Sequence, residues 1–537
     1  MATIRASKLF LIGLISAALV GIGLRFINIT DSQFVFYDEG MYLDYHIDFL
    51  YHLEKNPPKS VSQLGHYLSI AAHLSVANTK VLWFFISFLR GFFFGPEAWF
   101  FTRVVSAIFG SLTLGVIYLF AKKYYHSKWA GLLSLALLAV LPSHVFYSRL
   151  GLQEALSAFC FLSGFYFYFF PRKVNYRTFL SGVLFGAVFF TNYRMIVLPL
   201  VIGLCELGLC LVYKEKFNVR KFLYTTLTFL LIVFGIGNID HGANTNIAFA
   251  WMFYQAHLAR GQFDFLNLLA YPYYVFRLES LLFGLLFFAN IYYVIKKEWK
   301  KVLLFAIVCF QMVLFSFVKE QGARYMCVVM PFMAMAAATV LMDIFCAART
   351  SRKKAAVISL MVVLFTWHLV KSVEIMSFRS DYQSAMVDAR RINKSAAVLS
   401  TQPLIQKMFA AKREYVTDVP RSLKSFVGLY SKGYRYLMVD PQAYISYTDS
   451  RESFRLPLVG YLQFIQSNVA PVKTYKHFSP ALLERFVYEH SDSLRKSMAF
   501  LAKNKDGSLG ALRVYDIGMC IAIIKQGLNS IGQTHAL

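Results

Sequence analysis

Charged side chains are scarce in this chain of 537 residues, and acidic ones are fewer than basic ones. Only 16% of the residues are charged, with 29 Asp and Glu against 55 Lys and Arg. The hydrophobic share is 57%, including 53 Phe and 33 Tyr, which is more apolar surface than a soluble fold can bury. The composition therefore predicts an integral membrane protein.

The seven cysteines show no pairing pattern. Six of them lie in or beside apolar stretches, and Cys520 stands alone in the polar tail. Cys205 and Cys210 are too far apart for a C-x-x-C pair and fit the packing of one helix. The sequence thus excludes a disulfide framework and a thiolate metal site.

The formal net charge of +26 is compatible with nucleic-acid binding or with basic loops beside membrane spans. No basic run with interleaved aromatic residues stands out as a nucleic-acid module. We therefore expect membrane lipids, and no nucleic acid, among the partners.

Apolar runs long enough to cross about 30 Å of hydrocarbon recur along the chain. Eleven such runs are predicted as transmembrane helices, near residues 8–28, 100–121, 129–146, 154–170, 178–192, 196–213, 222–238, 278–295, 302–318, 326–346 and 354–373.

Basic residues cluster in alternate connections between these runs, which the positive-inside rule places on the cytoplasmic side. The loops 29–99 and 239–277 and the tail from about residue 376 then lie outside. The first run has a basic start like a signal peptide, but no convincing small-residue cleavage site precedes Arg25, which favours an uncleaved helix. A bacterial plasma (inner) membrane is the expected location.

We predict two domains, a transmembrane domain over 1–375 and a soluble extracytoplasmic α/β domain over 376–537. Mixed apolar and polar spacing predicts surface helices in the outer loops; these are expected at residues 42–53, 67–94 and 248–258. The tail alternates helical and extended patterns; helices are expected at 382–394 and 404–411, and strands at 396–400, 434–439 and 517–524.

Basic residues also occur in three short loops predicted to face outward, namely Arg149, Arg194, and Lys319 with Arg324. Each cation taken alone could extend to lipid headgroups. Their recurrence on one side favours a phosphate-binding site, because Arg grips phosphate oxygens in a fork and Lys adds a mobile charge.

Two adjacent acids, Asp38 and Glu39, follow the first span by about ten residues. A hydroxyl that attacks the anomeric carbon of a sugar must lose its proton, and a carboxylate is the usual acceptor. Alternatively, Asp38 caps the helix that follows. Glu154, at the start of the fourth span, allows either a site function or helix-start electrostatics.

Several short motifs, in this order and on one predicted face, resemble the GT-C class of membrane glycosyltransferases. The likeness is to the protein-mannosyltransferase-like branch, which includes the lipid A aminoarabinose transferases, and covers about residues 1–375. The matching motifs are Tyr37-Asp38-Glu39-Gly40, Pro57-Pro58, residues 103–110, Pro142 to Arg149, Glu154, Thr191-Asn192-Tyr193-Arg194, and Arg324-Tyr325 followed by Pro331.

The resemblance implies a sugar donor carried on polyprenyl monophosphate, inversion at the anomeric carbon and an acceptor outside the membrane. It implies Asp38 as the base, with Glu39 beside it and Glu154 as a second acid. Arg149, Lys319 and Arg324 with Tyr325 are implied as the donor phosphate grip. Substrate contacts are expected from Tyr37, Tyr42, His66, His144 and Tyr147.

Two positions depart from the family pattern. The family often has His before Pro-Pro and Lys after the Thr of the fifth span, where this chain has Asn56 and Asn192. We expect Arg194 to supply the missing cation.

No metal is assigned from the sequence. A divalent cation is left open because histidines such as His46 and His66 lie outside or near the outer face.

Two functions from other classes stay open at this point. A transporter or flippase for an anionic lipid or lipid-linked sugar would also need cations in a helical bundle, but no inverted repeat or glycine-interrupted pair of spans is evident. A scaffold whose tail binds other envelope proteins is the second. The sequence identifies neither the sugar nor the acceptor.

Overall fold

The structure is a computed structural model that separates into two compact units. The first comprises Met1–Thr30 and Tyr45–Met376, and the second comprises Asp31–Asp44 and Ser377–Leu537. The described residues are 2–30, 36–44, 46–76, 80–96, 98–170, 174–237, 265–318, 321–392, 397–410, 413–420, 422–440, 462, 464–476, 480–490, 493–504 and 510–530.

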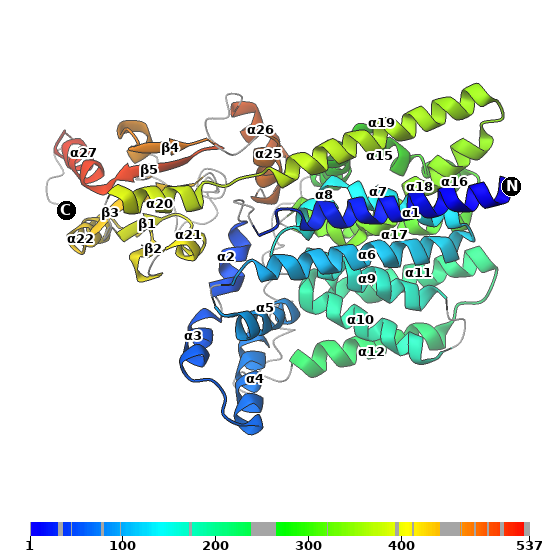
Figure 1. Cartoon of the computed structure of the whole chain (residues 1–537), viewed down its shortest axis with the longest axis horizontal. Helices are drawn as coiled ribbons and strands as arrows, with labels where there is room; N and C mark the ends of the chain where they lie inside the picture. The colour runs from blue at the N-terminus through cyan, green and yellow to red at the C-terminus, as the bar shows by residue number, and fades with distance from the viewer. Residues whose placement is uncertain are drawn as a thin grey trace. The chain divides into compact units, whose positions relative to one another are not determined.

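All regular elements in the described part of the first unit are helices (Figure 1). They are α1 (Ala2–Phe26), α3 (Ile47–Lys55), α4 (Val61–Val76), α5 (Val81–Phe94), α6 (Phe101–Tyr125), α7 (Lys128–Val140), α8 (Pro142–Ser148), α9 (Glu154–Phe169), α10 (Tyr176–Thr191), η1 (Tyr193–Val197), α11 (Leu198–Tyr213), α12 (Val219–Gly237), η2 (Phe265–Leu269), α14 (Ala270–Tyr274), η3 (Val275–Glu279), α15 (Leu281–Phe288), α16 (Ile291–Ile295), α17 (Trp299–Ser316), η4 (Ala323–Val329), α18 (Met330–Ala347) and α19 (Ser351–Met376).

Each of the eleven predicted spans falls on helix, and the fold class expected from the sequence is confirmed. Among the described residues, six helices are long and apolar enough to cross a membrane, and the bent pair α7–α8 brings the number to as many as seven. Helices such as α9, with 16 residues, reach only about 24 Å. The chain is thus a multi-pass membrane protein, and the number of eleven crossings stays a prediction.

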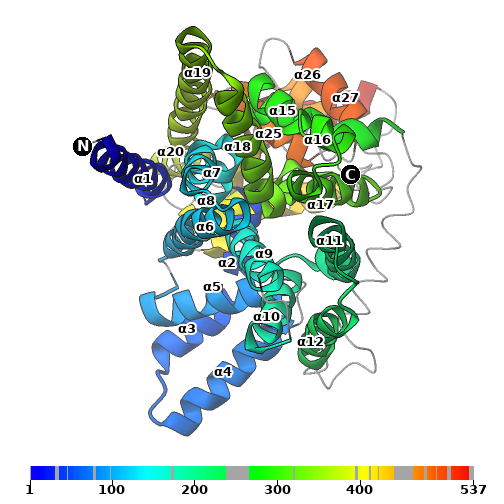
Figure 2. The same ribbon diagram turned by 90° about the vertical axis from the view of Figure 1, so that its right-hand side faces the viewer.

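Close helix packing in this unit depends on small residues. Helices α6, α9, α10 and α12 pack in succession, and α1 packs against α7 (Figure 2). A Cβ atom added to Gly21 of α1 would lie 2.9 Å from the Cβ atom of Ala139 in α7. One added to Gly182 of α10 would lie 2.6 Å from the Cβ atom of Thr228 in α12. Small residues let the backbones approach closely where apolar burial alone gives no net attraction.

The first outer loop contains helices as predicted, although their limits differ. The expected helix 42–53 is divided between α2 (Tyr37–Asp44) and α3, and the expected helix 67–94 is divided between α4 and α5. A cluster of buried side chains joins α3, α4 and α5; its members are Leu50, Leu53, Tyr67, Ala71 and Phe88. The expected helix 248–258 lies outside the described residues.

The second unit is an α/β layer, as the tail sequence predicted. Its described elements are α2, α20 (Tyr382–Ile392), β1 (Ala397–Ser400), α21 (Pro403–Phe409), η5 (Arg413–Tyr415), β2 (Val416–Asp418), α22 (Leu423–Ser431), β3 (Tyr434–Val439), β4 (Lys473–Tyr475), α25 (Pro480–His490), α26 (Leu494–Lys503), β5 (Leu512–Asp516) and α27 (Ile517–Ser530). The strand order is β2-β1-β3-β5-β4, with β1, β2 and β3 parallel and β5 antiparallel to both of its neighbours.

The strand predicted at residues 517–524 is wrong, because this segment begins helix α27. Buried residues recur there at Ile517, Cys520, Ile521 and Ile524, which is the spacing of one helix face. The Asp516 carboxylate accepts a hydrogen bond from the backbone N–H of Met519 at 2.9 Å and caps the first turn.

Helix α2 also differs from expectation. Residues 29–99 were expected to belong to the transmembrane domain, whereas Asp31–Asp44 belong to the same compact unit as the tail. Within that unit α2 packs against α21. The predicted acidic pair is therefore carried by the α/β unit.

The histidine before α3 gives a test of the packing of α3, α4 and α5. His46 is 2% exposed, with Nε2 at 3.2 Å from Ser75 Oγ and its ring centre at 5.6 Å from that of Phe88. Burial lowers the pKa of His46 from 6.5 to about 4, and the charge of Arg90 acts in the same direction.

We expect acid to destabilise this helix cluster. Between pH 6.5 and 4 the unfolded chain binds a proton at His46 that the folded chain does not, so stability falls by at most about 3 kcal/mol as the pH falls. Thermal unfolding in detergent at pH 7.5 and pH 5 measures this loss. His46→Gln should reduce the pH dependence, whereas His66→Gln, at an exposed position on α4, should not.

Candidate active site

The connection between α7 and α8 is a helix break inside an apolar bundle. The two helices meet at 63°, with Leu141 between them. Pro142 has no N–H to donate to the carbonyl of Leu138, and the N–H of Ser143 donates instead to Glu279 Oε2 at 3.2 Å. The carbonyls of the last turn of α7 therefore need other donors, since lipid supplies none.

Side chains from two other helices supply these donors. Arg25 of α1 donates from Nη2 to the carbonyl of Leu138 at 3.2 Å and from Nη1 to that of Ala139 at 3.1 Å. Ser372 of α19 donates to the carbonyl of Val140 at 2.8 Å. The break is thus held by hydrogen bonds from residues far away in the sequence.

Arg149 completes a reciprocal arrangement with Arg25. It follows α8 and donates from Nη1 to the carbonyls of Leu24 at 2.8 Å and Ile27 at 2.9 Å, at the end of α1. Arg25 thereby caps α7, and Arg149 caps α1. Much of the hydrogen-bonding capacity of Arg149 is used for structure, although its buried Nη2 has no hydrogen-bond partner among the described residues.

The other predicted residues of this segment are buried beside the break. His144 has Nδ1 at 2.6 Å from Arg25 Nη2, while its buried Nε2 has no hydrogen-bond partner in the described part of the chain. Tyr147 is 1% exposed. Their expected substrate contacts stay predictions.

Arg194, Arg324 and Tyr325, three of the residues predicted to bind the donor phosphate, lie together. The Arg194 guanidinium lies over the Tyr325 ring with Cζ at 3.7 Å from the ring centre, and the Arg324 guanidinium lies at 5.2 Å from the same centre. Arg324 also donates from Nη2 to the Tyr325 hydroxyl at 3.3 Å.

These three residues come from two short 3₁₀ segments, η1 and η4, that are distant in sequence. Each segment leads directly into a helix with a proline in its first turn, α11 or α18. Asn192 caps η1 by accepting a hydrogen bond from the N–H of Arg194 at 3.2 Å. Lys319, the fourth predicted cation, lies outside the described residues.

Glu154 starts α9 and is 6% exposed. Gln153 donates from Nε2 to Glu154 Oε1 at 3.1 Å. This location matches the helix-start alternative, because a carboxylate in a first turn is stabilised by the helix dipole. A function of Glu154 in the reaction site stays a prediction.

Asp38 and Glu39 differ in what they contact on α2. Glu39 Oε2 accepts a hydrogen bond from the N–H of Phe36 at 2.8 Å, which is the reach-back bond of a capping box. Asp38 Oδ2 accepts from the Tyr42 hydroxyl at 3.2 Å. This capping bond belongs to Glu39, whereas the sequence analysis considered capping as the alternative role of Asp38.

Other predicted residues are distributed over both units. Tyr37 is the first residue of α2, and His66 is exposed on α4 with its ring centre 6.2 Å from that of Tyr67. Asp38 and Glu39 belong to the second unit, whereas Glu154 and the described candidate cations belong to the first. A cavity shared by both stays a prediction.

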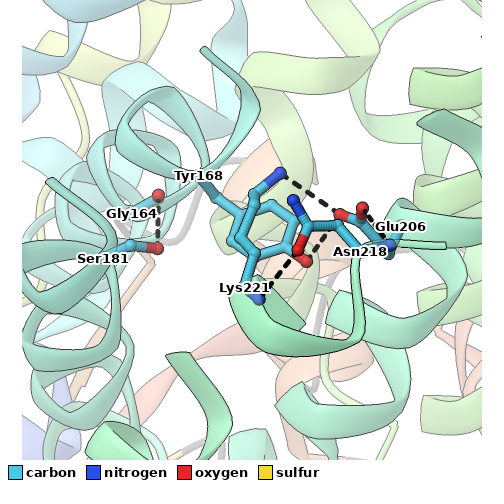
Figure 3. Close-up of polar contacts among 6 residues, drawn as sticks. All are labelled: Gly164, Tyr168, Ser181, Glu206, Asn218 and Lys221. Atoms are coloured by element: carbon cyan, nitrogen blue, oxygen red, sulfur yellow. Dashed lines mark hydrogen bonds and ion pairs between the residues drawn. The ribbon is translucent and has the colours of Figure 1, made fainter. Parts of the chain in front are cut away.

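Sequence reasoning missed a buried ion pair in the first unit. Lys221 Nζ lies 3.2 Å from Glu206 Oε2, and both side chains are at most 5% exposed (Figure 3). The Tyr168 hydroxyl donates to the same oxygen at 2.8 Å, and the Asn218 N–H donates to Glu206 Oε1 at 3.2 Å. This network joins α9, α11 and the start of α12. An acid inside an apolar run usually has a partner, so Glu206 within residues 196–213 could have indicated it.

Among the residues that the structure describes, no group of three His, Cys, Asp or Glu side chains could hold a metal ion. The expectation that no metal is needed stays a prediction.

Comparison with known proteins gives a family match over part of the chain and a similar fold. Residues 81–236 match the family described as dolichyl-phosphate-mannose-protein mannosyltransferase. The fold is similar to that of AglB, the oligosaccharyltransferase of Archaeoglobus fulgidus solved with an inhibitory peptide and a dolichol-phosphate, at a TM-score of 0.52 and 11% identity over 85% of this chain and 72% of that chain. The apo form of the Archaeoglobus fulgidus oligosaccharyltransferase matches with a TM-score of 0.51 and 11% identity over 81% of this chain and 70% of that chain.

ArnT of Cupriavidus metallidurans, solved with undecaprenyl phosphate, matches with a TM-score of 0.47 and 13% identity over 88% of this chain and 96% of that chain. The comparison with curated proteins finds no match. The archaeal structures share the fold, and the family match covers residues 81–236. Both findings agree with the GT-C glycosyltransferase class that the sequence predicted.

We expect Arg25 to contribute strongly to stability, because Arg25→Met leaves two buried carbonyls without these donors. The loss of each such bond costs roughly 1 to 3 kcal/mol. Ser372→Ala removes one donor from the same break and should cost less. Thermal unfolding of both variants in detergent measures the two losses of stability. A smaller loss for Arg25→Met than for Ser372→Ala would contradict the assignment of Arg25 as the main donor to the break.

Proposed function

We propose that this chain transfers a sugar from a polyprenyl-phosphate donor to an acceptor at the extracytoplasmic face of the plasma membrane. The observation that carries the donor assignment is the grouping of Arg194 and Arg324 around Tyr325. Positive charges are costly in a membrane domain, and residues of this kind mark binding sites and pathways.

An anion bound between these arginines would interact with both positive charges. A phosphate accepts several charge-assisted hydrogen bonds, and guanidinium groups donate in a fork that matches its oxygens. Arg324 is 8% exposed and Arg194 is partly buried, so both would bind an anion in surroundings that screen charge weakly. The phosphate of a membrane lipid suits a site made by residues beside apolar spans.

The neighbouring fold supports the lipid part of this assignment. The archaeal oligosaccharyltransferase was solved with a dolichol-phosphate, a lipid monophosphate. In this chain the prenyl tail would lie against apolar helices, and the sugar would face the outer side.

Asp38 is the proposed general base. The Glu39 carboxylate is engaged at the start of α2, whereas Asp38 is held through the Tyr42 hydroxyl. The acceptor oxygen forms a bond to the anomeric carbon, and its proton goes to Asp38. The bond from that carbon to the phosphate oxygen breaks, and the electron pair stays on the lipid phosphate.

A single displacement of this kind inverts the configuration at the anomeric carbon. Arg194 and Arg324, with Lys319 and Arg149 as further candidates, would stabilise the negative charge that develops on the leaving phosphate. Glu154 is proposed as a second acid that orients the substrate or partners Arg149. The guanidinium groups supply the positive charge, so the proposal includes no metal. Loss of transfer on treatment with a chelator would reveal a required divalent cation.

Asp38→Asn should lower transfer by roughly a hundredfold or more, because a general base contributes 10²–10⁴ to the rate. Glu39→Gln should stay close to wild type, because an amide oxygen can still accept the Phe36 N–H. The assay measures release of free polyprenyl phosphate by purified protein in detergent with candidate donors. Full activity of Asp38→Asn would remove the base assignment.

Arg194→Ala and Arg324→Gln should each weaken donor binding by roughly ten- to a hundredfold, because each removes charged hydrogen bonds worth about 1.5 to 3 kcal/mol. Titration of the purified protein with a polyprenyl monophosphate measures the change. Arg177→Ala, at an exposed position in the first turn of α10, is the matched control. Equal losses in all three variants would indicate non-specific charge attraction in place of a phosphate site.

A further inference from the structure

We infer that the α/β unit positions the acidic helix α2, with Arg413 as its positioning residue. This inference rests on the proposed function, because it concerns the placement of the Asp38 carboxylate. It gives the tail a function in the reaction that the sequence left open.

The first contact is a close approach of two helix backbones. A Cβ atom added to Gly40 would lie 2.8 Å from both the backbone nitrogen of Ile405 and the carbonyl carbon of Leu404. No side chain fits at that distance, so α2 lies directly against the first turn of α21. Gly40 directly follows the two acids. Its lack of a side chain is what allows α2 to pack this closely against α21.

The second contact is an ion pair at the other end of α2. Asp44, its last residue, forms an ion pair with Arg413 of η5, through Oδ1 and Nη2. Their side chains are 29% and 25% exposed, so the pair is partly shielded from water. A partly buried pair is screened less by salt than a fully exposed one.

The two elements that contact α2, α21 and η5, both lie in the connection between two adjacent parallel strands. Helix α21 follows β1, and η5 leads directly into β2, whose Val416 is paired with Val398. Arg390 of α20 donates to the carbonyl of Phe409 at 2.8 Å and holds the end of α21. The sheet therefore supports the surface on which α2 rests.

Asp38 lies between these contacts and the start of the helix. A displacement of about 1 Å at a reacting group can cost roughly a hundredfold in rate. Release of the Asp44 end should therefore lower turnover while leaving the binding of the donor phosphate to the first unit unchanged.

The test is a charge exchange across the ion pair. Asp44→Ala and Arg413→Ala should each reduce kcat about tenfold, with the donor KM unchanged. The double exchange, Asp44→Arg with Arg413→Asp, should restore most of the turnover. Arg391→Ala removes the exposed 3.7 Å ion pair with Asp388 in the same unit and should leave kcat unchanged.

Gly40→Ala provides a second variant. It should lower kcat further, and a cooperative thermal unfolding transition should show that the variant is still folded. The control is Gly428→Ala in α22, where an added Cβ atom meets nothing within 4 Å. Unchanged kcat in Arg413→Ala and Gly40→Ala, with Asp38→Asn inactive, would overturn the positioning inference alone. Lack of transfer by the wild-type protein would overturn the proposed function itself. A double exchange as impaired as the single variants would also overturn the positioning assignment.

Discussion

The arrangement of the first unit depends on one constraint: backbone carbonyls at a helix break need donors where lipid offers none. Pro142 creates the break, and Arg25, Ser372 and Glu279 supply the partners for its backbone groups. Because these residues come from α1, α19 and η3, the break connects elements from both ends of the membrane domain. Arg149 returns a hydrogen bond to α1, and the two helix ends hold each other.

The second unit solves a different problem, because an eight-residue helix such as α2 is too short to be stable alone. Glu39 caps its start, Gly40 allows it to lie against α21, and the Asp44–Arg413 ion pair holds its end. Three residues of α2 and its motif therefore each stabilise the helix in a different way: a cap, close packing and an ion pair. Glu39 holds the start of the helix, and the proposed chemistry is placed on the Asp38 carboxylate, which the Tyr42 hydroxyl orients.

Hydropathy predicted the helical spans because burial in lipid requires long apolar runs, and the strand at 434–439 because its apolar run is short and bounded by Gly433 and Asp440. The segment after residue 516 was misassigned because its helical spacing begins directly at the end of β5. No local pattern showed that Arg25 caps a distant helix or that α2 belongs with the tail. Both depend on partners more than 100 residues away in the sequence.

The structure also separates the cations by what they already bind. Arg25 and Arg149 donate to backbone carbonyls at helix ends, so their charge is largely committed to the fold. Arg194 and Arg324 both lie beside the Tyr325 ring, and a ring attracts a cation without neutralising it. The two guanidinium groups come from segments distant in sequence, each of which leads directly into a helix. This shared position of two cations is why the phosphate assignment is proposed for this pair.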